Sequence, residues 1–238
     1  MTLSRNKKNS SGIGLAATVA VALGVSACQM DTDTEVYVGD VREVYETGER
    51  LTTPVDLKVE MPSTDQCAEN RGEVESIMEE HLPGFEAREC GREDFQAFLY
   101  ASARIPVVSA EQVESVGDLD SLLGIAVSRD QGFDIEEVYA LQLYVDPERL
   151  SELNRYIQSE YYQDIDIAGS MATVRINNDE RETWTVMAEY AYVDGEPGLW
   201  TEREVERRDR VSVRLSDVAR SHMAQYSYAP IGWVAPQQ

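Results

Sequence analysis

Three cysteines are the residues with the most distinctive chemistry in this 238-residue chain. Cys28 directly follows an apolar run over residues 13–25, whereas Cys67 and Cys90 lie in the mixed polar sequence beyond it. A thiol can act as a nucleophile, bind a metal, carry a covalent group or form a disulfide, and its surroundings decide which. Because the surroundings differ, we expect Cys28 to serve a different purpose from Cys67 and Cys90.

The first 27 residues have the organisation of a signal peptide. Three basic residues precede the apolar run: Arg5, Lys7 and Lys8. The run itself is too short to cross a bilayer as a permanent helix. It ends in Val25-Ser26-Ala27-Cys28, which resembles the lipobox of bacterial lipoproteins. That resemblance implies cleavage before Cys28, with a diacylglyceryl thioether and an amide-linked acyl chain on this residue. The alternative is an ordinary secretory cleavage that leaves a free thiol.

The residues after Cys28 indicate in which membrane the protein is anchored. Gln29 stands where the enterobacterial sorting rule has an aspartate for retention at the inner membrane. The sequence therefore predicts an outer-membrane anchor facing the periplasm, with surface exposure and inner-membrane retention as the alternatives. Residues 29–35 alternate acidic side chains with Met and Thr, which predicts a short solvated tether. We thus expect a leader over 1–27, a lipidated tether over 28–35 and one domain over 36–238.

Cys67 and Cys90 are expected to form a disulfide, because paired cysteines in an oxidising compartment usually do so. A redox pair is disfavoured because no C-x-x-C spacing occurs. A metal site is disfavoured because His81 and His222 are the only histidines in the chain. The sequence pattern places Cys67 before a helix and Cys90 at the end of the following strand. The disulfide would then staple this helix to the sheet.

The chain is strongly acidic. The leader holds three of the 21 basic residues and none of the 44 acidic ones, so its removal changes the net charge from −23 to −26. Nucleic acid is excluded as a partner, because no basic surface is available to neutralise phosphates. The acids are spread along the chain, which favours adaptation to salt. At a Debye length of about 3 Å in molar salt, their mutual repulsion costs little.

The densest acidic segment is residues 129–137, which includes Asp130 and Asp134. Carboxylates suit calcium, but the spacing matches no standard calcium loop. Asp130 and Asp134 are therefore only weak candidates for metal ligands, and we expect neither a metal nor a cofactor.

The periodicity of the chain predicts an α+β fold in a single domain. Strands are indicated over residues 53–62, 95–108 and 138–145, and a series of antiparallel strands over 171–215. Two main helices, near residues 65–82 and 147–161, have one apolar face each and should pack on a mostly antiparallel sheet. The aromatic, proline-bearing residues 226–238 should lie on the surface of the domain.

No catalytic signature accompanies these elements. The sequence has no G-x-S-x-G, P-loop or H-E-x-x-H motif, and neither histidine lies near a recognisable nucleophile. Paired carboxylates could serve a hydrolase, but acids are so abundant that no particular pair stands out.

Four features resemble an uncharacterised family of small bacterial lipoproteins, some of them associated with prophages. They are residues 34–41 (TEVYVGDV), residues 51–54 (LTTP), the spacing of Cys67 and Cys90, and residues 215–218 (LSDV). The resemblance implies membrane anchoring and an α+β domain but no catalytic residues. We therefore expect a lipid-anchored, non-enzymatic binding module of a Gram-negative envelope, in envelope maintenance or phage exclusion. A carboxylate-dependent envelope hydrolase, with Asp130 and Asp134 as the first candidates, is the alternative.

Overall fold

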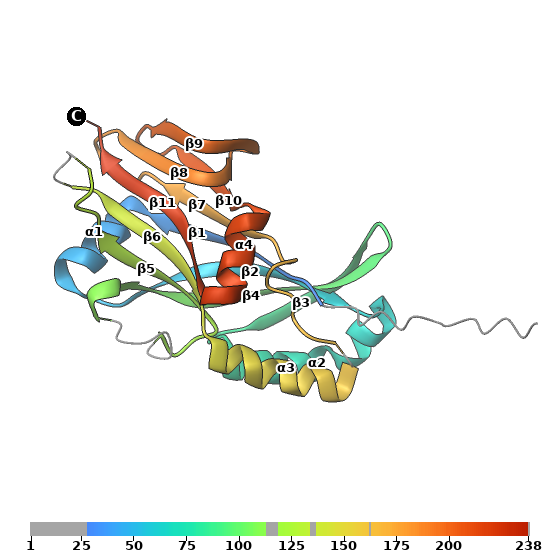
Figure 1. Ribbon diagram of the computed structural model, residues 1–238. Helices are drawn as coiled ribbons and strands as arrows, with labels where there is room; N and C mark the ends of the chain where they lie inside the picture. The colour runs from blue at the N-terminus through green and yellow to red at the C-terminus, as the bar shows by residue number, and fades with distance from the viewer. Residues whose placement is uncertain (1–27, 113–118, 134–136, 162, 238) are drawn as a thin grey trace, which may run out of the picture.

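The computed structural model describes residues 28–112, 119–133, 137–161 and 163–237. These residues form eleven strands, four α-helices and one 3-10 turn (Figure 1). The strands are β1 Met30–Tyr37, β2 Leu51–Met61, β3 Glu86–Glu93, β4 Gln96–Ser109, β5 Leu123–Arg129, β6 Tyr139–Val145, β7 Ala172–Asn177, β8 Trp184–Val193, β9 Glu196–Val205, β10 Arg210–Leu215 and β11 Tyr228–Pro236. The helical elements are α1 Val38–Thr47, α2 Thr64–His81, the turn Ala110–Gln112, α3 Pro147–Tyr161 and α4 Asp217–Tyr226.

Nine of the strands form a closed barrel in the order β10-β7-β1-β2-β4-β5-β6-β11-β8, and β8 also pairs with β10. The closing strand β8 pairs with β11 through residues 184–187 and with β10 through residues 191–193. Tyr190 lies between these two stretches with a left-handed φ of 49°. Two strands lie outside the ring: β3 pairs with β4, and β9 with β8.

The expected α+β fold, a mostly antiparallel sheet with two main helices packed on it, is wrong. The sheet closes on itself, and the four helices lie at its periphery. Two segments without a strand signal supply strands of the ring. Strand β1, which pairs with β2 and β7, lies mostly in the expected tether, and the expected surface tail contains β11, which pairs with β6 and β8. Alternation of apolar residues shows that a strand has a buried face, but it does not show whether the sheet closes.

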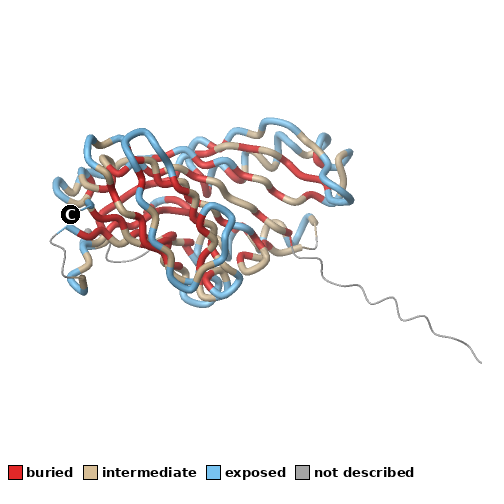
Figure 2. The backbone as a smooth tube through the Cα atoms, turned by 90° about the horizontal axis from the view of Figure 1, so that it is seen from above, coloured by how far each residue is buried: buried red, intermediate tan, exposed pale blue. Residues whose placement is uncertain are grey.

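The barrel interior is filled by side chains. Alternate residues along the strands point inward and join one apolar core, including Leu57, Leu99, Ile125, Leu141, Val174, Trp184, Val213 and Ile231. Figure 2 shows the buried segments running along the strands, with the exposed segments mainly at the turns. Since the interior is packed with aliphatic and aromatic groups, any binding site should lie on the outside of the barrel.

The helices cover different parts of this core. The apolar face of α1 buries Val38, Val41 and Val44, and Gly48 ends the helix in a left-handed conformation. Helices α2 and α3 lie side by side below the barrel, and α4 lies beside β11 (Figure 1). No helix in the described ranges is long and apolar enough to span a membrane.

Gly232 is required for the pairing of β11 with β8. Its φ is +151°, and a Cβ added there would collide with the carbonyl oxygen of Met187. We expect Gly232→Ala to lower the free energy of unfolding by about 1–3 kcal/mol, because strand β11 would have to move away from β8. Denaturant unfolding would measure this change.

Gly72→Ala provides the matched control. Gly72 lies in α2, and a Cβ added there would have no atom within 4 Å. This substitution should raise the stability by about 0.5–1 kcal/mol, because alanine favours the helix. An equal effect of both substitutions would show that the β8–β11 contact does not depend on the glycine.

Candidate functional site

Cys28 is built into the fold. Its side chain is only 4% exposed. Its N–H donates to the carbonyl oxygen of Asp164 at 2.7 Å, and its own carbonyl oxygen accepts from the N–H of Asp166 at 2.9 Å. These bonds form a parallel bridge between Cys28 and Ile165. The solvated tether expected over residues 28–35 is therefore not present, because the chain is held by the domain from Cys28 onward.

The environment of the Cys28 sulfur suppresses thiol reactivity. Sγ donates to the carbonyl oxygen of Glu60 at 2.8 Å. Burial, followed by the negative charge of Glu60, raises the pKa of the Cys28 thiol to about 12. Because the thiolate is the reactive species, a free Cys28 in this position would be a poor nucleophile and a poor redox group. A catalytic role for the free thiol is thereby disfavoured.

An apolar slot lies beside Cys28, between α2, α3 and the end of β2. We call it the α2–α3 slot. It is narrow, with a cavity volume of about 40 Å³. Its walls are formed by Cys28, Val59, Glu60, Met61, Pro62, Val74, Ile77, Met78, Leu153, Tyr156, Ile157, Tyr161, Gln163 and Ile165. Most of these side chains are aliphatic or aromatic, so the slot suits a hydrocarbon better than a polar ligand.

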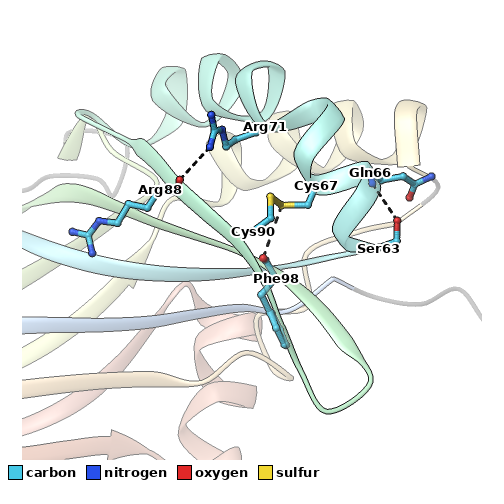
Figure 3. The surroundings of a disulfide bond; sticks show 7 residues. All are labelled: Ser63, Gln66, Cys67, Arg71, Arg88, Cys90 and Phe98. Atoms are coloured by element: carbon cyan, nitrogen blue, oxygen red, sulfur yellow. Dashed lines mark hydrogen bonds between the residues drawn. A yellow bond between two sulfur atoms is a disulfide. The ribbon is translucent and has the colours of Figure 1, made fainter.

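Cys67 and Cys90 form the disulfide expected from the sequence, with their Cα atoms 6.0 Å apart. It joins the first half of α2 to β3 (Figure 3). Ser63 caps α2, accepting a hydrogen bond from the N–H of Gln66 at 3.1 Å, and Arg71 donates to the carbonyl oxygen of Arg88 at 3.3 Å. The helix is thus fixed to β3 at its N-terminal end, while its C-terminal half lines the slot.

The acidic segment around Asp130 does not form a metal site among the described residues. One Asp130 oxygen accepts from the indole N–H of Trp233 at 2.7 Å, and the other from the N–H of Gly132 at 2.8 Å. Asp134 lies outside the described residues. Within those ranges, no group of three or more His, Cys, Asp or Glu side chains is placed to hold a metal ion. The carboxylate of Asp130 therefore has a structural role, orienting Trp233 and a turn.

Acid–base chemistry also lacks an assembled site in the described part of the chain. Asp146 is the one buried carboxylate there, and it caps α3 by accepting from the N–H groups of Glu148 and Arg149. His81 is buried, and burial followed by the charge of Arg149 lowers its pKa. His222 is occupied by a contact of 2.9 Å between Nδ1 and the carbonyl oxygen of Tyr228. The described residues hold no facing pair of buried carboxylates such as a hydrolase would need.

Strands β8 and β9 carry exposed apolar side chains that sequence reasoning did not single out. Leu199 is 77% exposed, Tyr190 54% and Trp200 45%. Tyr190 belongs to β8, and the neighbours Leu199 and Trp200 point to opposite faces of β9. We call these three residues together the β9 surface. Trp200 packs against Phe133 and Trp233, with ring centroids 6.4 and 5.7 Å away. Leu199 and Tyr190 line a shallow groove beside α4. Aromatic side chains that remain partly exposed on an otherwise charged surface are typical of protein interaction sites.

Comparison with protein families identifies the domain. A model described as a domain of unknown function, DUF7424, matches residues 30–238. The chain belongs to this family. Comparisons with curated proteins and with solved structures found no match. The matched domain begins with the first residue of β1, two residues after Cys28, so the family model includes the segment that alternation of acids had indicated as a tether.

Family membership extends over both features of the site. The DUF7424 domain contains the α2–α3 slot except for Cys28, and it contains the whole β9 surface. Sequence reasoning predicted Cys28 and the disulfide as chemically special, but it could not place Cys28 against α2 and α3. Contacts between residue 28 and residues 164–166 bridge more than 130 positions, and no local pattern reports them.

The disulfide should contribute substantially to stability. Closing a loop across a sequence separation of 23 residues is worth about 3 kcal/mol on the chain-entropy estimate. We expect Cys67→Ala to lower the melting temperature by roughly 6–12 °C without abolishing the fold. Calorimetry of the variant and of the reduced wild type should give similar shifts, and an unchanged melting temperature would contradict the proposed role.

The burial of Cys28 predicts slow alkylation in unlipidated protein produced without the leader. At pH 8, iodoacetamide should react with folded protein at least about 100-fold more slowly than with unfolded protein, because little thiolate is present.

The raised pKa of Cys28 also makes stability depend on pH, because the folded state holds the thiol proton more tightly than the unfolded state. The contribution of the protonated Cys28 thiol to the free energy of unfolding is therefore fully present below pH 9 and is lost as pH rises towards 12. The free energy of unfolding should fall by at most about 1.4 kcal/mol per pH unit over this range. Cys28→Ser should remove that part of the alkaline destabilisation, and an identical pH profile would contradict the assignment.

Proposed function

We propose that this protein is a lipid-anchored, non-enzymatic interaction module of a Gram-negative envelope. Cys28 carries the acyl chains that hold it to the outer membrane, and the domain faces the periplasm. The β9 surface binds a protein partner. The observation that carries the binding function is the exposure of Leu199 and Trp200 on β9, a strand with one free edge, and of Tyr190 on the neighbouring strand β8.

The anchoring part of the proposal is supported by sequence and position together. The motif Val25-Ser26-Ala27-Cys28 ends a signal-like leader, and Cys28 is held against the domain by its bridge to Ile165. Three acyl chains on one residue hold a protein to a bilayer far more firmly than a single chain, which binds only marginally. The domain itself has no need of a membrane-spanning helix in this arrangement.

The binding part of the proposal is supported by the free edge as well as by exposed side chains. In the described part of the chain, β9 pairs with β8 alone, so its second edge presents unpaired backbone groups. An extended segment of a partner could add to this edge, with aromatic side chains fixing its position. Strand β9 lies above the barrel, whereas α2 and α3 lie below it (Figure 1). An anchor near α2 and α3 would leave the β9 surface turned away from the membrane.

The same surface suits either setting implied by the family resemblance, envelope maintenance or exclusion of a superinfecting phage. In both settings the protein acts by binding a partner and does not catalyse a reaction on it. The described acids offer no arrangement that favours the hydrolase alternative.

The anchor is tested by fractionation of cells that express the full chain. Wild type should be recovered in the outer-membrane fraction with about three acyl chains by mass, and Cys28→Ser should be unprocessed or released into the periplasm. Recovery of unlipidated wild type as a soluble periplasmic protein would contradict the anchor.

The binding surface is tested by chemical cross-linking in cells followed by affinity purification from detergent-solubilised envelope. Trp200→Ala should reduce recovery of a cross-linked protein by at least about tenfold, because buried aromatic contacts dominate interface energies. Phe95→Ala is the matched control, since Phe95 is 93% exposed but lies at the distant β3–β4 turn. Loss of the partner in both variants, or in neither, would contradict the assignment to the β9 surface.

A further inference from the structure

The α2–α3 slot is an apolar surface that the fold itself leaves incompletely filled. Protein interiors are normally packed to the density of organic crystals. Here Leu153 is the one fully buried residue of α3, and Leu150 and Ile157 are only partly buried against the core. The layer formed by α2 and α3 thus leaves more of its apolar side chains exposed than the barrel beside it. Additional hydrocarbon in the slot would cover apolar side chains that now face open space.

Cys28 forms part of the wall of this slot. Its backbone contacts are compatible with acylation of the mature N-terminus. An amide-linked acyl chain leaves one hydrogen on the Cys28 nitrogen, which can still donate to Asp164, and the carbonyl can still accept from Asp166. A thioether has no S–H, so the sulfur would give up its donation to Glu60 and its side chain could turn. The fold can therefore keep Cys28 in place after lipidation.

We infer that one acyl chain of lipidated Cys28 folds back into the α2–α3 slot, while the other two enter the membrane. This inference rests on the lipidation proposed above. The occupant is covalently attached at the wall of the slot, so its effective concentration is high and no separate ligand is needed. The two remaining chains suffice for stable anchoring.

The slot must widen to admit the chain. Tyr156, in the wall of the slot, donates from its hydroxyl to the Glu73 carboxylate at 2.6 Å, and this bond joins α3 to α2. Both partners lie towards solvent, so this bond can break without burying a charge. The disulfide fixes Cys67 in α2 to β3, and the carbonyl oxygens of Glu80 and His81 at the C-terminal end of α2 accept hydrogen bonds from Arg149 and Leu122. Because α2 is held at both ends, the widening falls on the side chains that line the slot.

The test uses full-length protein from cells fed a palmitate analogue that carries a diazirine at its terminal carbon. After purification in dodecyl maltoside and irradiation, peptides are mapped by mass spectrometry. We expect the acylated Cys28 peptide to be cross-linked to residues 74–78 of α2 or 153–161 of α3. Cross-links to detergent alone, on a Cys28 peptide that carries the acyl chains, would overturn the slot while leaving the anchor intact. A Cys28 peptide without acyl chains would overturn both.

A matched pair of substitutions locates the chain. Val74→Trp places a large side chain in the slot and should reduce cross-linking to α3 by at least about fivefold. Val218→Trp makes the same change on the exposed face of α4, where Val218 is 65% exposed, and should have no effect. Equal cross-linking in both variants would overturn the slot. If Val74→Trp does not fold by circular dichroism, the wild-type cross-linking pattern decides alone.

Discussion

Closure of the barrel by β8 is the constraint on which the rest of the structure depends. This strand pairs with β11 along its first half and with β10 at its end, so it joins two parts of the ring. Closure buries the inward face of every strand and leaves no edge within the ring itself. The remaining free edges belong to strands outside the ring, and one of them, β9, bears the exposed apolar surface.

Local features were largely predictable, because they depend on neighbours in the sequence. The α2 and α3 helices, the Cys67–Cys90 disulfide and the series of strands over residues 171–215 follow from short patterns. Closure was not predictable, because it depends on β1 and β11. Strand β1 alternates acids with small polar residues, and β11 contains two prolines and a glycine, so both lack the usual signal of a strand. Their pairing partners, and not their own composition, make them strands.

The candidate sites also combine features that the local sequence predicts with features that depend on distant contacts. Cys28 was identifiable from its leader, but its burial depends on Asp164 and Asp166, which follow α3. Likewise, Leu199 and Trp200 fall in a segment that the sequence correctly indicated as a strand, yet their exposure follows from the position of β9 outside the ring. A period of two cannot distinguish a strand inside the barrel from one attached to its outer edge.

The direct hold on Cys28 has a mechanical consequence. A flexible tether of seven residues would let a domain wander by roughly 15 Å from its anchor, since the end-to-end distance grows as 5–6 Å times the square root of length. Here these residues are fixed in β1 and in the bridge to Ile165, so they cannot act as a flexible tether. With Cys28 lipidated as proposed, the domain would be confined to a thin layer at the bilayer surface with restricted tilt. It would search for partners by diffusing along the membrane, and a partner attached elsewhere in the envelope would have to approach that layer to meet it.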